Sequence, residues 1–384
     1  MMDAGRDQAL ASVSTQPGEI TDEGIDALRA RIGTPMRHLA RDAVVSQEWI
    51  DRFAYGIGDI NPLWSDPLYA ARTSHGSTIA PPAMVFVLGG WDVGTGLPGV
   101  HGLYTGCEIE WARNVFCDEV LHSTGHLCAV DEKHGEFAGR MVLQGTETTF
   151  ENAAGATVAV MRNYNLRTSR RVGRERRASD ATRAVDHASY TEEELAQIEI
   201  EILRSEIRGD LPRTSDDVEV GAHLVPVVKG PLTTTDVVAW MRTGFGGVRE
   251  GMFLYPHEFA TIWRRRHPAA VMRTPWGYVD SPESVHWDDG QAQAAGAPAA
   301  YDIGPQRISW MCQTITNWMG DDAALKQLSV RLKKFVAMGD TVWSHGVVTE
   351  KTENLVAISL TASNQRGEVV GTGRATVALP TGHE

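Results

Sequence analysis

The chain carries an internal duplication whose two copies differ at one chemically important position. Part of the segment Tyr55–Asp66 is repeated in imperfect form 222 positions later, at residues 285–288. When the two copies are aligned at this offset, the second copy has His286 where the first copy has Trp64. A repeat on this scale predicts two similar folding units in one chain, so it constrains the fold before any local pattern does.

Each copy begins with helix-like segments and continues into strand-like segments. The helices are expected at residues 46–53, 83–91, 234–240 and 307–316. Alternating segments rich in β-branched residues predict antiparallel strands at residues 108–111, 139–150 and 355–363. Helices followed by an antiparallel sheet, present twice, predict an α+β fold.

A chain of 384 residues exceeds the usual size of a single core, so two domains of ordinary size are expected. The expected parts are a flexible N-terminus, an N-terminal repeat, a linker with a connecting helix, and a C-terminal repeat, at residues 1–25, 26–165, 166–215 and 216–384. The connecting helix should begin after Thr191, a suitable N-cap, and present an exposed charged face. The Arg-rich run at residues 167–177 is expected to be a solvated linker rather than a phosphate site.

The composition argues against several classes of protein. Hydrophobic residues make up 42% of the chain and charged residues 22%, and no apolar run reaches the ~18 residues that would span a bilayer. The net charge of −13 argues against a nucleic-acid partner. The four cysteines lack metal-binding spacing, and the N-terminus lacks the layout of a signal peptide. We therefore expect a soluble cytoplasmic protein with no metal site and no membrane partner.

The motif at Asp59–Asp66, followed by Ile79–Pro81 before a second helix, resembles that of the MaoC-like (R)-specific enoyl-CoA hydratases and dehydratases. The resemblance covers both halves and includes a FAS1-type dehydratase-like N-terminal repeat. It implies a double hotdog, in which each repeat wraps an antiparallel sheet around a long helix and the two repeats pair like a dimer. It also implies an acyl-CoA thioester substrate, no cofactor beyond that CoA, and an assembly that can include a homodimer of double hotdogs. One repeat would keep the chemistry while the other shapes the substrate tunnel.

The first copy lacks two groups that the resemblance assigns to catalysis. In the family, an Asp and a His of the motif act as acid and base, and the backbone N–H of a Gly 18 residues after the His stabilises the thioester oxygen. The first copy keeps Asp59 and Asn61 but has Trp64 in the His position, and an indole cannot exchange the proton. Its donor position is Pro82, which has no N–H. We expect this site to be degenerate.

The second copy has both groups at the required spacing, namely His286 and the backbone N–H of Gly304. The carboxylate is less directly assigned, because the position of the family Asp is occupied by Ser281. Asp280 is the first choice for the partner of His286, and Glu283 is the second.

Other residues near this motif carry weaker expectations. Asp288 is expected to cap the following helix, because the first copy also has an Asp in this frame. Trp287, Trp310 and Asn317 are candidates to line an acyl channel, with ordinary core packing as the alternative. His257 and Glu258, in a segment inserted in the second copy, are expected to be structural.

The sequence therefore predicts a hydro-lyase that adds water to, or removes it from, a 2-enoyl-CoA thioester with a bulky acyl group. Such chemistry needs a base, an acid and an oxyanion donor, which the second copy offers. Two alternatives stay open: a non-catalytic partner subunit of another hydratase, and a hotdog acyl-CoA thioesterase.

Overall fold

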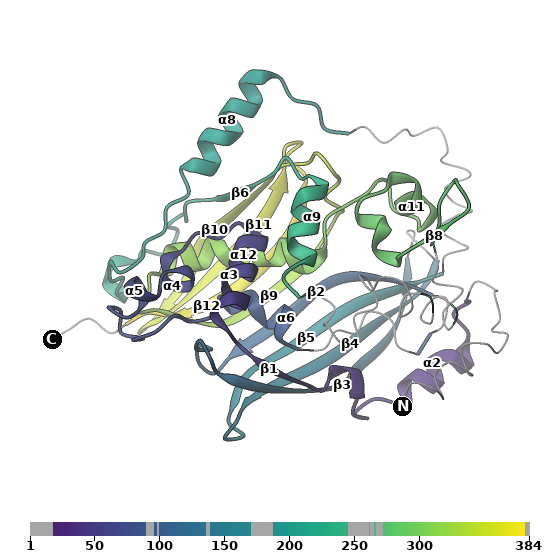
Figure 1. The fold of residues 1–384 in the computed structure, drawn as a ribbon, viewed down its shortest axis with the longest axis horizontal. Helices are drawn as coiled ribbons and strands as arrows, with labels where there is room; N and C mark the ends of the chain where they lie inside the picture. Colours follow the sequence, from purple (N-terminus) through teal and green to yellow (C-terminus); the bar gives the residue numbers. More distant parts are fainter. Residues whose placement is uncertain are drawn as a thin grey trace.

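The computed structural model describes residues 18–380 apart from 90–95, 98–99, 136–138, 170–186, 245–260, 262–264 and 266–271 (Figure 1). The strands are β1 (Arg41–Val44), β2 (His101–Trp111), β3 (Val120–Gly135), β4 (Gly139–Asn152), β5 (Thr157–Thr168), β6 (Val227–Lys229), β7 (Met272–Arg273), β8 (Val279–Asp280), β9 (Ala324–Leu332), β10 (Val342–Thr352), β11 (Leu355–Asn364) and β12 (Val369–Ala378). The α-helices are α2 (Asp22–Arg29), α3 (Gln47–Ile57), α4 (Pro62–Ser65), α5 (Pro67–Ala70), α6 (Val85–Leu88), α8 (Glu192–Leu203), α9 (Thr234–Met241), α11 (Asp289–Ala294) and α12 (Gly304–Met319). The 3₁₀ helices are η1 (Arg37–Leu39), η2 (Pro82–Met84), η3 (Ser215–Asp217) and η5 (Pro282–His286).

One continuous antiparallel sheet of ten strands joins the two repeats. Its strand order is β1-β3-β4-β5-β2-β9-β12-β11-β10-β6. Each half therefore has the same order read outward from the centre, with β9, β12, β11, β10 and β6 taking the places of β2, β5, β4, β3 and β1. Figure 1 shows the two half-sheets as blue and yellow strands that meet at β2 and β9. This order confirms the duplication and the predicted side-by-side pairing of the repeats.

The two halves meet along the antiparallel pair β2–β9, from Gly106 opposite Arg331 to Glu110 opposite Gln327. Gly106 has a positive φ of 150°, and a Cβ atom placed on it would lie 2.1 Å from the carbonyl oxygen of Val330. Only glycine permits this close approach of the two backbones. The junction is therefore built into the sequence of β2.

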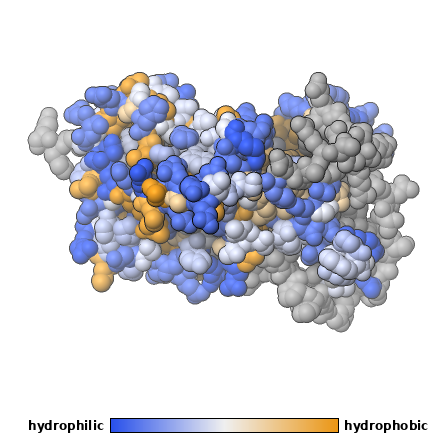
Figure 2. Space-filling view, turned by 90° about the horizontal axis from the view of Figure 1, so that it is seen from above, coloured by the Kyte–Doolittle hydropathy of each residue, from blue (hydrophilic) through white to orange (hydrophobic). Residues whose placement is uncertain are grey.

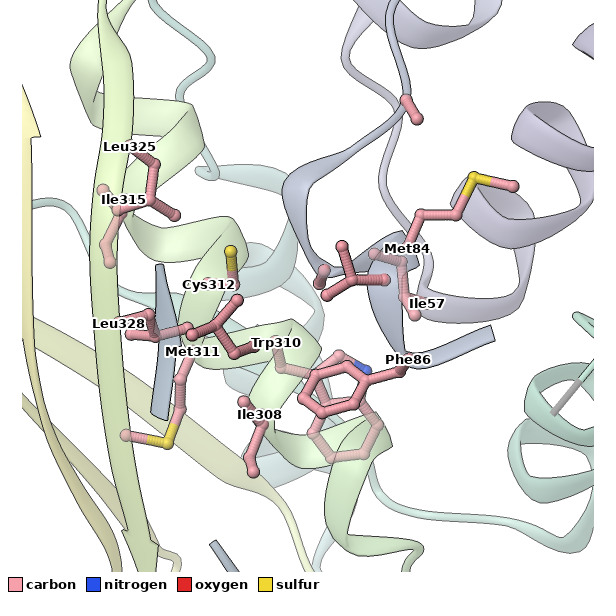
Figure 3. Close-up of a cluster of buried hydrophobic side chains, with 14 of the residues drawn as sticks. Ile57, Met84, Phe86, Ile308, Trp310, Met311, Cys312, Ile315, Leu325 and Leu328 are labelled. Atoms are coloured by element: carbon pink, nitrogen blue, oxygen red, sulfur yellow. The ribbon is translucent and has the colours of Figure 1, made fainter. Parts of the chain in front are cut away.

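The helix α12 lies in the interior between the halves. Almost all of its residues are buried, and its apolar side chains pack on β9. The elements η2 and α3 of the first half pack on this helix, and Figure 3 shows the ring of Phe86 turned toward it. One continuous core therefore includes residues of both repeats.

The corresponding helix of the first repeat is much shorter than predicted. Residues 83–91 were expected to be helical, but the structure has the 3₁₀ turn η2 followed by the four-residue helix α6. Gly89 ends α6 with an extended backbone, at φ −98° and ψ 178°. Glycine costs a helix about 1 kcal/mol relative to alanine, so the pair Gly89-Gly90 disfavours extension.

The segment that connects the two repeats agrees only in part with the sequence prediction. The helix α8 begins after Thr191 with a capping box and buries only Ile198, as predicted. The strand β5, however, extends to Thr168, so the Arg-rich run begins inside the sheet. Arg167 is buried and donates to Gln144 and to the carbonyl groups of Leu97 and Val100, which corrects its assignment as solvated. The run from 170 to 177 lies outside the described residues.

The surface seen in Figure 2 is mostly hydrophilic, with apolar side chains in small groups. Within the described ranges, no helix is long and apolar enough to cross a membrane. The helix α2 begins at Asp22, inside the segment expected to be flexible, whereas residues 1–17 lie outside the described part of the chain.

Candidate active site

The 3₁₀ helix η5 carries the candidate histidine. The side chain of Ser281 accepts a hydrogen bond from the backbone N–H of Glu283, and Pro282 follows at the first helical position. Both residues favour the start of a helix at this point. In a 3₁₀ helix, side chains three residues apart lie directly above one another. The local sequence therefore brings the side chains of Glu283 and His286 together.

The side chains of Glu283 and His286 form a shielded pair. Nε2 of His286 lies 3.2 Å from Oε2 of Glu283, and the two side chains are 11% and 13% exposed. Nδ1 of His286 lies 2.8 Å from the carbonyl oxygen of Tyr301. A carbonyl oxygen can only accept, so Nδ1 carries a proton and Nε2 is the atom that exchanges one with Glu283.

The charge state of His286 follows from this arrangement. Burial disfavours the charged imidazole, but the hydrogen bond and the negative charge of Glu283 outweigh that effect and raise the pKa of His286 above its ordinary value. The carbonyl group of Tyr301 and the charge of Asp302 act in the same direction. The ring of Tyr301 covers the imidazole edge-on, with 4.7 Å between the ring centroids. The pair can therefore hold one shared proton.

The structure places Glu283, the second choice, against His286. Asp280 ends β8, and its carboxylate accepts a hydrogen bond from the backbone N–H of Ser281 at 2.7 Å. In the frame of the duplication, Glu283 corresponds to Asn61 and Ser281 corresponds to Asp59. Asp59 accepts from the N–H of Asn61 at 3.0 Å, just as Ser281 accepts from the N–H of Glu283 at 3.2 Å.

The candidate oxyanion donor lies at the start of α12. Gly304 is the first residue of this helix, where a backbone N–H has no acceptor within the helix, and it is partly exposed. The aligned peptide dipoles also make this end of the helix positive. Because His286 binds the carbonyl group of Tyr301, only three residues earlier, the imidazole and the helix start are neighbours.

A buried ion pair holds the segment that leads into α12. Arg307 donates to the carboxylate of Asp302 and to the carbonyl groups of Lys334 and Val370. Both charged side chains are at most 3% exposed. Sequence reasoning missed this pair, although Arg307 is the only charged residue of the helix and a buried arginine requires a partner. The pair positions Tyr301 and Gly304 on either side of Asp302.

The corresponding site of the first repeat is closed. The indole N–H of Trp64 donates to the carboxylate of Asp59 at 3.0 Å, and both residues are buried. Burial raises the pKa of Asp59, while the Asn61 N–H, the charge of Lys229 and the Trp64 N–H oppose this rise. Pro82 begins η2 without a backbone N–H to offer. Neither proton transfer by residue 64 nor an oxyanion contact at residue 82 is chemically available here.

This closed site rests against the second repeat. Lys229 donates to the carbonyl groups of Ile57 and Gly58 at the end of α3, at 2.9 and 2.7 Å. Gln313 of α12 also donates to the carbonyl group of Gly58, at 3.4 Å. Gln313 lies nine residues after Gly304, which corresponds to about 13 Å along the helix. Both sites are therefore built against one helix.

The remaining candidates lie in different places. Trp287 follows η5 directly and is partly buried against the core, and Trp310 is buried in the same core as Phe86. Asn317 donates to Ser205 near the far end of α12, about 20 Å along the helix from Gly304. Asp288 caps α11 by accepting from the N–H of Gln291, which confirms the prediction for that residue. His257 and Glu258 lie outside the described residues.

No group of three or more His, Cys, Asp or Glu side chains that could hold a metal ion occurs in the described part of the chain. A shared proton at His286 and Glu283 beside a free N–H can serve acid–base chemistry next to a carbonyl group.

Comparisons with known proteins give one family match and several structures of the same fold. Residues 30–161 match the model of the FAS1-like dehydratase domain region. A solved structure described as a MaoC-like dehydratase has a TM-score of 0.63 at 16% identity, over 92% of this chain and 100% of its own. No curated protein sequence gives a significant match.

Two further structures share the fold. A protein from Chloroflexus aurantiacus assigned to the MaoC-domain dehydratases has a TM-score of 0.58 at 12% identity, over 97% of this chain and 100% of its own. A conserved hypothetical protein from Mycobacterium tuberculosis, described as a double hotdog, has a TM-score of 0.54 at 11% identity, over 93% of this chain and 99% of its own. The chain therefore has the double-hotdog fold that these structures share, and its residues 30–161 match a FAS1-like dehydratase region.

Proposed function

We propose that the protein is a hydro-lyase that interconverts a 2-enoyl thioester and its 3-hydroxyacyl product, and that the second repeat performs the reaction. The observation that carries this proposal is the shielded pair of His286 and Glu283, held at the start of α12 by the carbonyl group of Tyr301. The partly exposed Gly304 begins that helix.

The proton balance of the pair suits hydration. Glu283, as a carboxylate, takes a proton from water while the oxygen forms a bond to Cβ of the enoyl group. His286, as an imidazolium, delivers its Nε2 proton to Cα as the double bond electrons move there. The pair begins and ends with one proton, first on His286 and then on Glu283. Dehydration is the same sequence in reverse, so one arrangement serves both directions.

The N–H of Gly304 supports the intermediate stage of this scheme. Negative charge develops on the thioester oxygen before Cα is protonated, and a hydrogen-bond donor aimed at that oxygen stabilises it. The helix start provides such a donor without a metal or a further cofactor. The first repeat lacks the corresponding groups, because Trp64 and Pro82 occupy their positions.

We further propose that the carrier is CoA and that the acyl group is bulky. Support for both comes from the resemblance to enoyl-CoA hydratases and from the first repeat, whose loss of chemistry leaves it able to contribute to substrate binding. The partner-subunit alternative is disfavoured, since a protein without activity has no need of the His286–Glu283 pair beside Gly304.

The test is the hydration of 2-enoyl-CoA thioesters, followed by the loss of enoyl-thioester absorbance. The wild-type protein should be active, and His286→Ala should lower kcat by ~10²–10⁴-fold with little change in KM. The matched control is His122→Ala, because His122 also pairs with a carboxylate, that of Asp42 at 2.5 Å, but on the surface of the first repeat. Unchanged activity in a folded His286→Ala protein would overturn the proposal.

A further inference from the structure

We infer that Tyr104, a residue of the first repeat, forms the wall of the reaction site at Gly304 and determines which acyl groups fit there. This inference rests on the proposed function and deepens it. It makes Tyr104 a specificity-determining residue that the non-catalytic half supplies to the catalytic half.

The contact between Tyr104 and Gly304 is direct. A Cβ atom placed on Gly304 would lie 2.6 Å from Cδ1 and 3.3 Å from Cβ of Tyr104, and 2.9 Å from Cδ1 of Leu332. Real Cβ atoms do not approach other atoms this closely, so the tyrosine ring occupies the space beside the first residue of α12.

The end of the β2–β9 pairing directs Tyr104 to this place. The pairing with β9 begins at Gly106, two residues after Tyr104. The register between β2 and β5 also shifts between Tyr104 and Gly106, which marks an irregularity in the strand. Such irregularities redirect side chains and end strand pairing. Tyr104 and Leu332 therefore flank the point where the two halves cease to be joined, and the start of α12 lies beside both residues.

The ring is held firmly but is not sealed in the core. The hydroxyl group of Tyr104 donates to Oδ1 of the buried Asn163 at 2.7 Å. Tyr104, Gly304 and Leu332 are each only partly buried. A ring that is anchored at its tip and only partly buried can contact a ligand without changing its own conformation.

A bound thioester would meet this ring at its reacting carbons. If its carbonyl oxygen accepts from the Gly304 N–H at about 2.7–3.1 Å, then Cα is only two bonds away from that oxygen. The space around Cα is limited by Tyr104, which lies against the same glycine. The ring should therefore exclude thioesters with a substituent at Cα.

The experiment compares kcat/KM for crotonyl-CoA, its α-methyl-branched analogue and 2-octenoyl-CoA. In Tyr104→Ala, the ratio for the branched over the unbranched four-carbon substrate should rise at least tenfold, since one methyl group in a tight site is worth ~10–200-fold. Tyr104→Phe keeps the ring and should keep the wild-type ratio. Tyr104→Leu serves as the reduced-ring variant if the alanine protein does not fold. The control Tyr55→Ala removes an exposed ring, 81% accessible, and should leave all three values unchanged.

The two ideas can fail separately. If the wild-type protein turns over these substrates and the ratio is the same in Tyr104→Ala or Tyr104→Leu, the inference about Tyr104 is wrong while the proposed function stands. If no thioester is turned over, calorimetric binding of the saturated acyl-CoA analogues tests the wall directly. A shift in binding preference toward the branched analogue in Tyr104→Ala would then support the inference about Tyr104 even though the proposed reaction had failed. No shift would overturn the inference about Tyr104.

Discussion

The indole N–H of Trp64 donates to the carboxylate of Asp59 over 3.0 Å, whereas His286, at the position of Trp64 in the second repeat, lies 3.2 Å from Glu283, which corresponds to Asn61. Both repeats thus have a contact between an aromatic ring nitrogen and a carboxylate, which is buried in the first repeat and partly buried in the second. The indole nitrogen cannot give up its proton, whereas the imidazole nitrogen can. Residue 64 of the first repeat therefore offers no acid–base group at the position where the second repeat has an imidazole.

Replacing Trp64 by Phe should destabilise the protein by about 1–3 kcal/mol. The variant keeps an aromatic ring but leaves the buried Asp59 carboxylate without one of its donors. Urea unfolding of the full chain measures the change. The control is Trp276→Phe, at a tryptophan that is 76% exposed, which should stay within about 0.5 kcal/mol of wild type. Equal stabilities for the two variants would show that the Trp64–Asp59 bond contributes nothing.

The partner of His286 can be decided by two isosteric substitutions. Glu283→Gln removes the carboxylate that lies 3.2 Å from Nε2 of His286, so kcat for hydration should fall ~10²–10⁴-fold. Asp280→Asn keeps an oxygen that can accept from the Ser281 N–H, so kcat should change by no more than a few-fold. Both kcat values come from the absorbance assay. The reverse order of effects would restore Asp280 as the catalytic carboxylate.

The pH dependence should follow the shared proton. Glu283 raises the pKa of His286 against the opposing effect of burial, so removal of its charge in Glu283→Gln should lower that pKa. NMR titration of the imidazole, assigned by comparison with His286→Ala, measures both values. The reactive pair carries one proton, so wild-type kcat/KM should fall about tenfold per pH unit above the pKa of His286. A pKa that is equal in the two proteins would show that Glu283 does not act on His286.

The free energy of unfolding should also depend on pH, because folding changes the pKa of His286. Folding raises the pKa of His286, so the native state binds its proton more tightly than the unfolded chain does. The resulting stabilisation is complete below the ordinary pKa of histidine and is lost as the pH rises through the raised value. Urea unfolding of the wild-type protein and of Glu283→Gln should therefore differ most on the acidic side of neutrality. A difference that grows as the pH rises would contradict the assignment.

The fold could be predicted from the sequence because the duplication presents the same order of helices and strands in two copies. Matching positions such as Asp118 and Asp340, one before β3 and one before β10, determine how the repeats correspond, and the helices and strands then follow from periodicity. The short α6 was not predicted, because apolar pattern alone does not reveal where glycines end a helix. The buried Arg167 was also missed, since its charge resembles that of the run that follows.

The sequence predicted His286 and Gly304 as site residues and ranked Asp280 above Glu283, whereas the structure places Glu283 against His286. Linear register pointed to the residue nearest Ser281, which is Asp280. The 3₁₀ helix instead superimposes side chains three residues apart, and this selects Glu283. Tyr104 was not a candidate, because its contact with Gly304 joins residues from different repeats. Such contacts depend on how the half-sheets meet, which no local pattern encodes.

The contact between Gly304 and Tyr104 gives the last prediction. Gly304→Ala keeps the backbone N–H but places a Cβ atom 2.6 Å from Tyr104, so overpacking should cost about 1–3 kcal/mol of stability. Tyr104→Ala removes the ring, so the double variant should recover part of that loss, with a coupling energy of about 1 kcal/mol or more. Gly304→Pro removes the N–H itself and should lower kcat by ~10²–10³-fold whether or not Tyr104 is present. Unfolding free energies and kcat for six proteins, namely wild type, the three single variants and the two double variants, decide between these effects. If the stability losses of Gly304→Ala and Tyr104→Ala simply add in the double variant, the ring does not limit the space beside the helix start. If Tyr104→Ala restores kcat in Gly304→Pro, the N–H is not the oxyanion donor.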